Sequence, residues 1–367
     1  MNTEQSKLFG QYNLRGNHLQ NRIAMAPMTR SRTIGEEVVT PLAAEYYGQR
    51  ATAGLIITEG SPISKVGRGY SMTPGIYTPE QIEGWKIVTD EVHAQGGKIF
   101  IQLWHVGRRS HSLISGEQPH APSSLKVTDK VYGPLQEGGF GMIETELPKA
   151  MTLEDIKKTQ QDFVQAAKNA MEAGFDGVEL HGAHGYFIDS FLRLHANERT
   201  DQYGGSKENR MRFLLETITA VTEAIGGEKT AIRLSPHVAE GAAAHDPEII
   251  DLTYEILKAL EPLNLAYIHF SENISNYQEV PDSFRTKVRA IYNGPIMVAG
   301  KLTKAKAEAI LAKKQADLVA FGQPFIFNPD LVQRMKNNWP LNEGRADAHS
   351  TFYGGGAEGY TDYPFYQ

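Results

Sequence analysis

Residues 177–187 read GVELHGAHGYF, a short apolar run that passes directly into a loop with two histidines and a tyrosine. Similar apolar runs recur along the chain, and most place Ile, Val and Leu at consecutive positions without strict alternation. Strands that are buried on both faces have this pattern, which is typical of parallel sheets. The predicted strands are residues 23–26, 55–58, 99–103, 177–180, 231–234, 266–270, 296–299 and 318–321.

Segments with the periodicity of amphipathic helices lie between these strands. They are residues 156–173, 212–225, 247–260 and 304–314. Gly174 predicts the end of the first helix, and Thr303 predicts the N-cap of the last. Strands that alternate with helices predict an α/β fold, a single (β/α)₈ TIM barrel, and we expect one domain over residues 1–367. A doubly wound open sheet is the alternative, disfavoured because no GxGxxG motif follows the first strand.

Two segments interrupt the alternation of strands and helices. Residues 106–150, rich in Gly, Pro, Ser and His, predict a long excursion after the third strand. Residues 351–367 form an aromatic C-terminal tail. Long loops in compact enzymes usually form lids or active-site walls, so we expect both segments near the site.

Composition excludes several classes of function. The chain has 43 acidic and 37 basic residues, a net charge of −6, which offers no basic surface for nucleic acid. The absence of cysteine excludes disulfides, thiolate metal sites and a Cys nucleophile. No apolar run approaches the roughly 18 residues of a membrane span, and the first ten residues, MNTEQSKLFG, lack a signal-peptide pattern. We therefore expect a soluble cytoplasmic protein without a nucleic-acid or membrane partner.

The loop that follows the fourth predicted strand carries His181, His184 and Tyr186. Barrel enzymes place catalytic groups after the carboxyl ends of their strands. The imidazoles could hydrogen-bond a substrate oxygen on which charge develops, and the phenol could deliver a proton. Two alternatives remain open from the residues alone. One is a metal site, and hence a metal-dependent hydrolase, built on His181 and His184; the other is a structural histidine pair.

Other polar or small residues occupy strand ends. Gly300 and Gly322 follow the last two strands, where barrels commonly bind phosphate. Arg233 lies inside an apolar strand and requires an anionic ligand or a buried carboxylate. Gln102 ends another strand and offers a donor and an acceptor suited to an amide-like ring edge. Ordinary turn glycines and a satisfied core glutamine are the corresponding structural alternatives.

Longer stretches extend from these residues, and they are distinctive. They read NRIAMAPMTRSR (21–32), RGYSMTPGIY (68–77), QLWHVGRRSH (102–111), GVELHGAHGYFIDSFL (177–192), NERTDQYGGSKENRMRFLLE (197–216), IRLSP (232–236), DLVAFGQPFIFNPDL (317–331) and FYGGGAEGYTDYP (352–364). Over essentially its whole length the sequence resembles the old yellow enzyme family of flavin-dependent ene reductases. In particular it resembles the bacterial branch that includes N-ethylmaleimide reductase and pentaerythritol tetranitrate reductase.

The resemblance implies non-covalent FMN bound by a (β/α)₈ barrel. Thr29 would donate to the flavin carbonyl beside N5, Gln102 would pair with the pyrimidine edge, and Arg233 would lie by N1 and O2. The resemblance implies further FMN-binding residues. They make backbone contacts, contribute one histidine or line the phosphate end. These residues are Pro27, Met28, Gly60, His181, Gly300, Lys301, Gly322 and Gln323.

The resemblance also implies the reaction. His181 and His184 would hold the carbonyl or nitro oxygen of an electron-poor alkene such as an enone, maleimide or nitroalkene. Flavin N5–H would give hydride to the β carbon, and Tyr186 would protonate the α carbon. NADPH or NADH would reduce the flavin at the same site, and nitro compounds and nitrate esters are further candidate substrates. Three aromatic residues would shape the pocket: Tyr70, Trp104 and Tyr353.

One departure from the family pattern concerns the phosphate end. The family usually has Gly-Arg where this chain has Gly322-Gln323, so an expected guanidinium is missing. A charge-assisted contact then becomes at best a neutral hydrogen bond, which Lys301 could partly replace. This substitution predicts weaker retention of FMN.

We expect a monomer or weak homo-oligomer.

Overall fold

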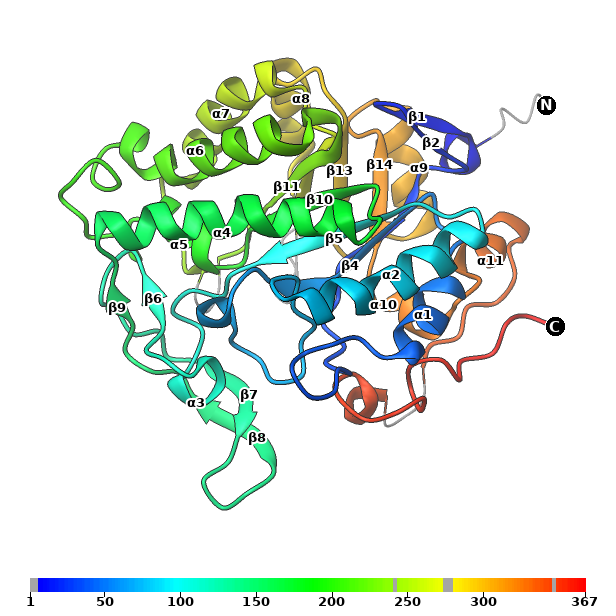
Figure 1. Ribbon diagram of the computed structural model, residues 1–367. Coiled ribbons are helices and arrows are strands. Elements are labelled where there is room, and N and C mark those ends of the chain that lie inside the picture. The colour runs from blue at the N-terminus through cyan, green and yellow to red at the C-terminus, as the bar shows by residue number, and fades with distance from the viewer. Residues whose placement is uncertain (1–5, 240–242, 273–279, 345–347) are drawn as a thin grey trace.

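The apolar runs form the strands of a closed parallel barrel (Figure 1). The computed structural model describes residues 6–239, 243–272, 280–344 and 348–367. The strands pair around the barrel in the order β3, β4, β5, β10, β11, β12, β13 and β14 before returning to β3, so the predicted (β/α)₈ barrel is confirmed and the open sheet is wrong. Their bounds are Ile23–Met25, Leu55–Pro62, Ile99–Trp104, Gly177–Gly182, Thr230–Leu234, Tyr267–Ser271, Ile296–Ala299 and Leu318–Phe321.

Every residue of these strands is buried. One hydrophobic cluster lies between the strands and the helices, and a second fills the barrel with side chains such as Leu55, Phe100 and Met297. The β1–β2 hairpin (Tyr12–Leu14, Asn17–Leu19) adds Leu14 and Leu19 to the second cluster. Because both faces of each strand are covered, the strands read as continuous apolar runs.

Helices surround the barrel (Figure 1). The Thr303 side chain accepts from the Lys306 N–H and caps α9, and Gly174, with φ of +85°, ends α4; both predictions are confirmed. The helices are α1 Pro41–Gly48, α2 Pro79–Ala94, α4 Leu153–Glu172, α5 Phe187–Leu192, α6 Lys207–Ile225, α7 Ile249–Leu260, α8 Asp282–Ile291, α9 Lys304–Ala312, α10 Gln323–Phe327 and α11 Leu331–Asn337.

β4 and β10 run at least two residues past their predicted ends, and this changes the placement of site residues. Gly60, expected in a loop after β4, lies within that strand and pairs with Gln102 beyond an irregularity in the ladder. His181, expected in the loop after β10, is itself a strand residue and pairs with Arg233 of β11. In both cases the parallel ladder continues past the last apolar residue, because backbone hydrogen bonding does not depend on the polarity of the side chain.

The excursion over residues 106–150 contains α3 (Ser112–Ser115), β6 (His120–Ala121), the hairpin β7–β8 (Lys130–Pro134, Phe140–Glu144) and β9 (Lys149–Ala150). The hairpin projects away from the barrel in Figure 1. Its strand β7 contacts the loop after β4, where the Ser71 N–H donates to the Tyr132 carbonyl at 2.9 Å. The excursion is therefore anchored beside the loop that carries Tyr70.

Buried guanidinium groups tie the C-terminal tail to the first βα loop. Arg30 donates to the carbonyls of Phe352 at 3.0 Å and Gly359 at 2.7 Å. Arg32 donates to the Thr351 carbonyl at 2.6 Å. The tail thus lies over the carboxyl end of the barrel. Among the described residues, no helix combines the length and apolar character of a membrane span, and residues 1–5, part of the stretch checked for a signal peptide, lie outside them.

Candidate active site

A cavity of about 600 Å³ opens at the carboxyl end of the barrel. Its size lies within the range of small-molecule and cofactor sites. The structure brings together here nearly all the residues singled out in the sequence; Tyr70 and Tyr353 are not among its lining. The predicted residues that line it are Pro27, Met28, Thr29, Gly60, Gln102, Trp104, His181, His184, Tyr186, Arg233, Gly300, Lys301, Gly322 and Gln323.

The loop after β10 turns sharply to present its side chains to this cavity. His184 and Gly185 both have left-handed backbone conformations, with φ of 61° and 72°. For a non-glycine residue this conformation is strained and needs support from its surroundings. The His184 N–H donates to Ser235 Oγ at 2.8 Å, and the Gly185 N–H donates to Asp189 Oδ2 at 2.7 Å. These two hydrogen bonds hold the turn.

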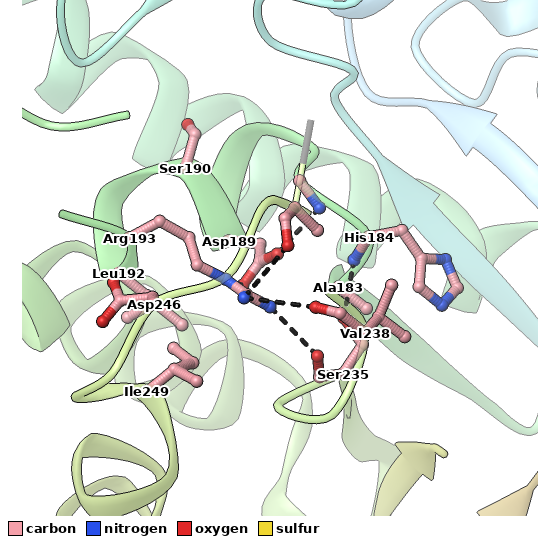
Figure 2. Close-up of polar contacts among 12 residues, drawn as sticks. Ala183, His184, Asp189, Ser190, Leu192, Arg193, Ser235, Val238, Asp246 and Ile249 are labelled. Atoms are coloured by element: carbon pink, nitrogen blue, oxygen red, sulfur yellow. Dashed lines mark hydrogen bonds and ion pairs between the residues drawn. The ribbon is translucent and has the colours of Figure 1, made fainter. Parts of the chain in front are cut away.

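Arg193 joins both supports of the turn, as Figure 2 shows. Its Nε donates to Asp189 Oδ1 at 3.1 Å, and its Nη2 donates to the Ser235 carbonyl at 3.0 Å. The guanidinium is fully buried and donates further to the Val238 carbonyl at 3.3 Å. It therefore locks the loop after β11 against the loop that carries His184. The sequence reasoning missed this residue, although Asp189 in α5 and Arg193 at its C-cap stand at i, i+4 spacing.

The two imidazoles are neutral hydrogen-bonding groups. Burial, and next the nearby Arg233 guanidinium, hold the pKa values of His181 and His184 well below the ordinary range. The Ala183 N–H donates to His181 Nδ1 at 3.3 Å, which leaves Nε2 of that ring to carry the proton. His184 Nε2 is buried and has no hydrogen-bond partner among the described residues. The ring centroids are 5.3 Å apart, so one ligand oxygen can meet both.

Aromatic rings form one wall of the site. Trp104 stacks against His181 at 5.9 Å, and Tyr70 stacks against Trp104 at 5.5 Å. The hydroxyls of Tyr70 and Tyr186 are 3.2 Å apart. Burial raises the pKa of Tyr70 well above its usual value, so its hydroxyl keeps its proton. Tyr353, at 57% exposure, faces solvent at the rim of the site.

A buried carboxylate that the sequence reasoning missed lies below the cavity. Glu179 accepts from Gln102 Nε2 at 2.7 Å and contacts His269 Nδ1 at 2.8 Å. Burial alone would raise the pKa of Glu179, but His269 and Arg233 lower it, so the group is ionised. It orients the Gln102 amide and balances the Arg233 charge. The only signal in the sequence is one acidic residue within a buried strand.

The polar atoms of the cavity match a flavin. The lining residues of the cavity include two with a buried N–H group that has no hydrogen-bond partner among the described residues, Arg233 Nε and Trp104 Nε1. A Cβ at Gly60 would lie 2.6 Å from the Trp104 ring, so the strand keeps its close approach there only with glycine. Gln102 and Arg233 supply the donors that an amide-like, electron-accepting ring edge requires. Lys301 lines the opposite end of the cavity, where a phosphate would be placed.

The metal alternative finds no support. Among the described residues no group of three His, Asp or Glu side chains is arranged to hold a metal ion. Arg233 acts on both imidazoles electrostatically, and a second cation beside it would be repelled. A metal-dependent hydrolase on His181 and His184 is therefore not supported.

A parallel barrel with neutral donors, an arginine and a glutamine around one carboxyl-end cavity defines a flavin-dependent oxidoreductase. The chain belongs to the NADH:flavin oxidoreductase / NADH oxidase family, whose sequence profile matches residues 7–342. It is 40% identical to 12-oxophytodienoate reductase 7 of Oryza sativa subsp. japonica, over 99% of this chain and 95% of that protein.

Solved structures agree with this assignment. Morphinone reductase in complex with tetrahydroNAD is 45% identical, with a TM-score of 0.93 and 98% of each chain covered. The old yellow enzyme homologue from Zymomonas mobilis is 37% identical, with a TM-score of 0.91, covering 98% of this chain and 99% of that one. The resemblance to old yellow enzymes is confirmed, and the chain is an FMN-dependent NAD(P)H oxidoreductase.

Glu179→Gln is expected to raise the midpoint potential of bound FMN by roughly 30 mV or more. For a two-electron couple this shift is a tenfold change in the equilibrium constant for reduction. The carboxylate opposes the negative charge that gathers on a reduced flavin beside Arg233, and the neutral amide would remove that opposition. Spectroelectrochemical titration measures the shift. Glu144→Gln, on the exposed strand β8, is the matched control. An unchanged or lower potential would contradict the assigned role of Glu179.

Gln323→Arg is expected to tighten FMN binding roughly fivefold. A guanidinium that meets the phosphate makes a charge-assisted bond, which is worth about 1 kcal/mol more than a neutral one. Titration of the apoprotein with FMN, followed by flavin fluorescence, gives the dissociation constant. Gln333→Arg, an exposed position on α11, controls for added charge. If both variants bind FMN as the parent does, the glutamine does not limit retention.

Proposed function

We propose that this protein reduces the carbon–carbon double bond of electron-poor alkenes, including enones, maleimides and nitroalkenes, with NADPH or NADH as reductant. The observation that carries the proposal is the convergence of two neutral imidazoles and one phenol, His181, His184 and Tyr186, on one cavity. The names of its relatives support it, because morphinone reductase and the 12-oxophytodienoate reductases are reductases. Nitro compounds and nitrate esters are further proposed substrates.

Bound FMN would supply the hydride chemistry that links the nicotinamide and the alkene, and the lining residues of the cavity would hold it. The imidazoles act on the substrate's activating oxygen. His181 and His184 donate N–H hydrogen bonds to the carbonyl or nitro group and stabilise the negative charge that develops on it. Because both rings are neutral, they bind uncharged substrates and the nicotinamide amide alike. We therefore propose that alkene and nicotinamide occupy the same place in turn.

Tyr186 completes the reduction by giving its proton to the α carbon. A phenol is protonated at neutral pH and far more acidic than the carbon it protonates, so the transfer is downhill. The protonated Tyr70 hydroxyl, 3.2 Å away, can hydrogen-bond the Tyr186 oxygen once that proton has left. Trp104, whose ring lies edge-on to Tyr186 at 4.9 Å, covers the same side of the site.

The remaining residues serve the cofactor in this proposal. Thr29 would hydrogen-bond the flavin and Gln102 and Arg233 would hold its pyrimidine end, while Tyr353 would shape the substrate pocket from the rim. The backbone and phosphate contacts come from the lining residues Pro27, Met28, Gly60, Gly300, Lys301, Gly322 and Gln323. We further propose one domain over residues 1–367, a monomer or weak homo-oligomer, and action in the cytoplasm, where the reductant NAD(P)H is supplied.

A visible absorbance experiment tests the function. The purified protein, loaded with FMN, is expected to be yellow, to bleach with NADPH under anaerobic conditions and to regain colour with cyclohexenone. Reduction of the cyclohexenone double bond is monitored as the loss of the absorbance of the conjugated enone. A protein that takes up no FMN, or whose reduced form is not reoxidised by any enone, maleimide or nitroalkene, would overturn the proposal.

A further inference from the structure

Arg109 is a partly buried cation beside the active site that the proposed function does not use. It lies in the segment after β5, and its Cζ stands 4.7 Å from the centroid of the Tyr186 ring. Its Nη2 pairs with Asp129 Oδ2 at 2.7 Å, and its Nη1 lies 3.4 Å from the His184 carbonyl. Its Nε is buried without a hydrogen-bond partner among the described residues. This guanidinium, which belongs to the excursion, thus contacts Asp129 of the same segment, the histidine loop and the ring of the phenol.

The charge of Arg109 matters most after the proton has left Tyr186. In that step the phenol O–H bond breaks, a C–H bond forms at the substrate, and the electron pair of the O–H bond stays on the phenol oxygen. A cation over the ring face attracts a neutral phenol weakly and a phenolate strongly. The attraction therefore grows during the transfer, which is the condition for lowering its barrier.

Other titratable groups also face the Tyr186 ring. Tyr70 contacts its hydroxyl, the neutral His181 ring lies 5.0 Å away, and the Tyr353 phenol interacts with it electrostatically from the tail. These three carry no charge at neutral pH. Asp129, in the residues that precede β7, is the counter-charge of Arg109 and weakens its field at the ring.

We propose that Arg109 is a further residue of the proton-delivery step: it positions the Tyr186 ring and stabilises the phenolate, while Asp129 of the excursion moderates its charge. The inference rests on the proposed role of Tyr186 as proton donor. It gives the excursion a part in the chemistry, because the excursion carries the carboxylate that sets the strength of the cation.

The test compares Arg109→Met with Asp129→Asn in the FMN-loaded enzyme. The rate at which cyclohexenone reoxidises the reduced protein is measured by stopped flow across pH. Arg109→Met is expected to lower the rate roughly tenfold and to move the alkaline fall in rate to higher pH, because the phenolate is less stable. Asp129→Asn is expected to move that fall to lower pH. The near-ultraviolet absorbance of the Tyr186 phenolate is obtained by subtracting the spectrum of each variant that also carries Tyr186→Phe. The pH at which this absorbance appears should shift in the same two directions.

Opposite shifts support the electrostatic role, since loss of a structural contact would move both variants the same way. If the alkaline fall in rate moves in the same direction in both variants, or moves in neither, the electrostatic role of Arg109 is overturned. If Arg109→Met does not hold FMN, the direction of the Asp129→Asn shift decides alone. Lys130→Met, which removes an exposed charge next to Asp129, is the matched control and should leave the profile unchanged. If Tyr186→Phe itself leaves reoxidation intact, the role of Tyr186 as proton donor fails and the role of Arg109 fails with it, whereas the proposed function fails only if the parent enzyme is not reoxidised by the alkene.

Discussion

Replacement of Tyr186 by phenylalanine is expected to slow reoxidation of the reduced enzyme by an enone about 100-fold or more, the usual contribution of a positioned general acid. Reduction of the bound flavin by NADPH should stay nearly unchanged, because no proton from a side chain is needed there. The ring contacts with Trp104 and His181 do not involve the hydroxyl, so the fold should hold. The substitution removes one oxygen atom and its proton.

Stopped-flow measurement of the two half-reactions separates these effects. Tyr132→Phe, on the hairpin of the excursion, removes a hydroxyl outside the cavity and is the matched control. Equal losses in both half-reactions would mean that Tyr186 shapes the site instead of supplying a proton. Unchanged rates in both would remove it from the mechanism.

Replacement of His181 by alanine is expected to lower kcat/KM for enones by about 10²–10³-fold, as for loss of one donor to a developing negative charge. The imidazole is 5% exposed and stacks on Trp104, so its loss also opens space beside the indole. The nicotinamide should bind more weakly as well, because both ligands are proposed to use the same donors.

Two measurements check this result. Stopped-flow reduction by NADPH gives the nicotinamide affinity, and titration with a phenol, followed by the long-wavelength absorbance of the flavin complex, reports the donors without turnover. His18→Ala, an exposed residue of the β1–β2 hairpin at the other end of the barrel, is the control. A loss confined to the enone, with normal nicotinamide and phenol binding, would show that the two ligands do not share His181.

Much of the fold could be predicted because its determinants are local. Residues 296–299 and 318–321 match β13 and β14 at both ends, since a strand buried on both faces carries its own apolar pattern. Thr303 likewise marks the start of its helix by a hydrogen bond to a residue three positions on. The ends of β4 and β10 could not be predicted, because their ladders run past the apolar residues into Gly60 and His181.

The candidate site divides in the same way. The linear sequence determined which polar side chains reach the cavity, because in a parallel barrel the carboxyl ends of all strands meet on one face. Only the tertiary structure decided which groups support them. Glu179 meets His269 across 90 positions of sequence, and Arg109 meets Tyr186 of the loop after β10 as well as Asp129 farther along the excursion. Such pairings depend on through-space electrostatics and side-chain packing between distant segments, which leave no periodicity or spacing in the chain itself.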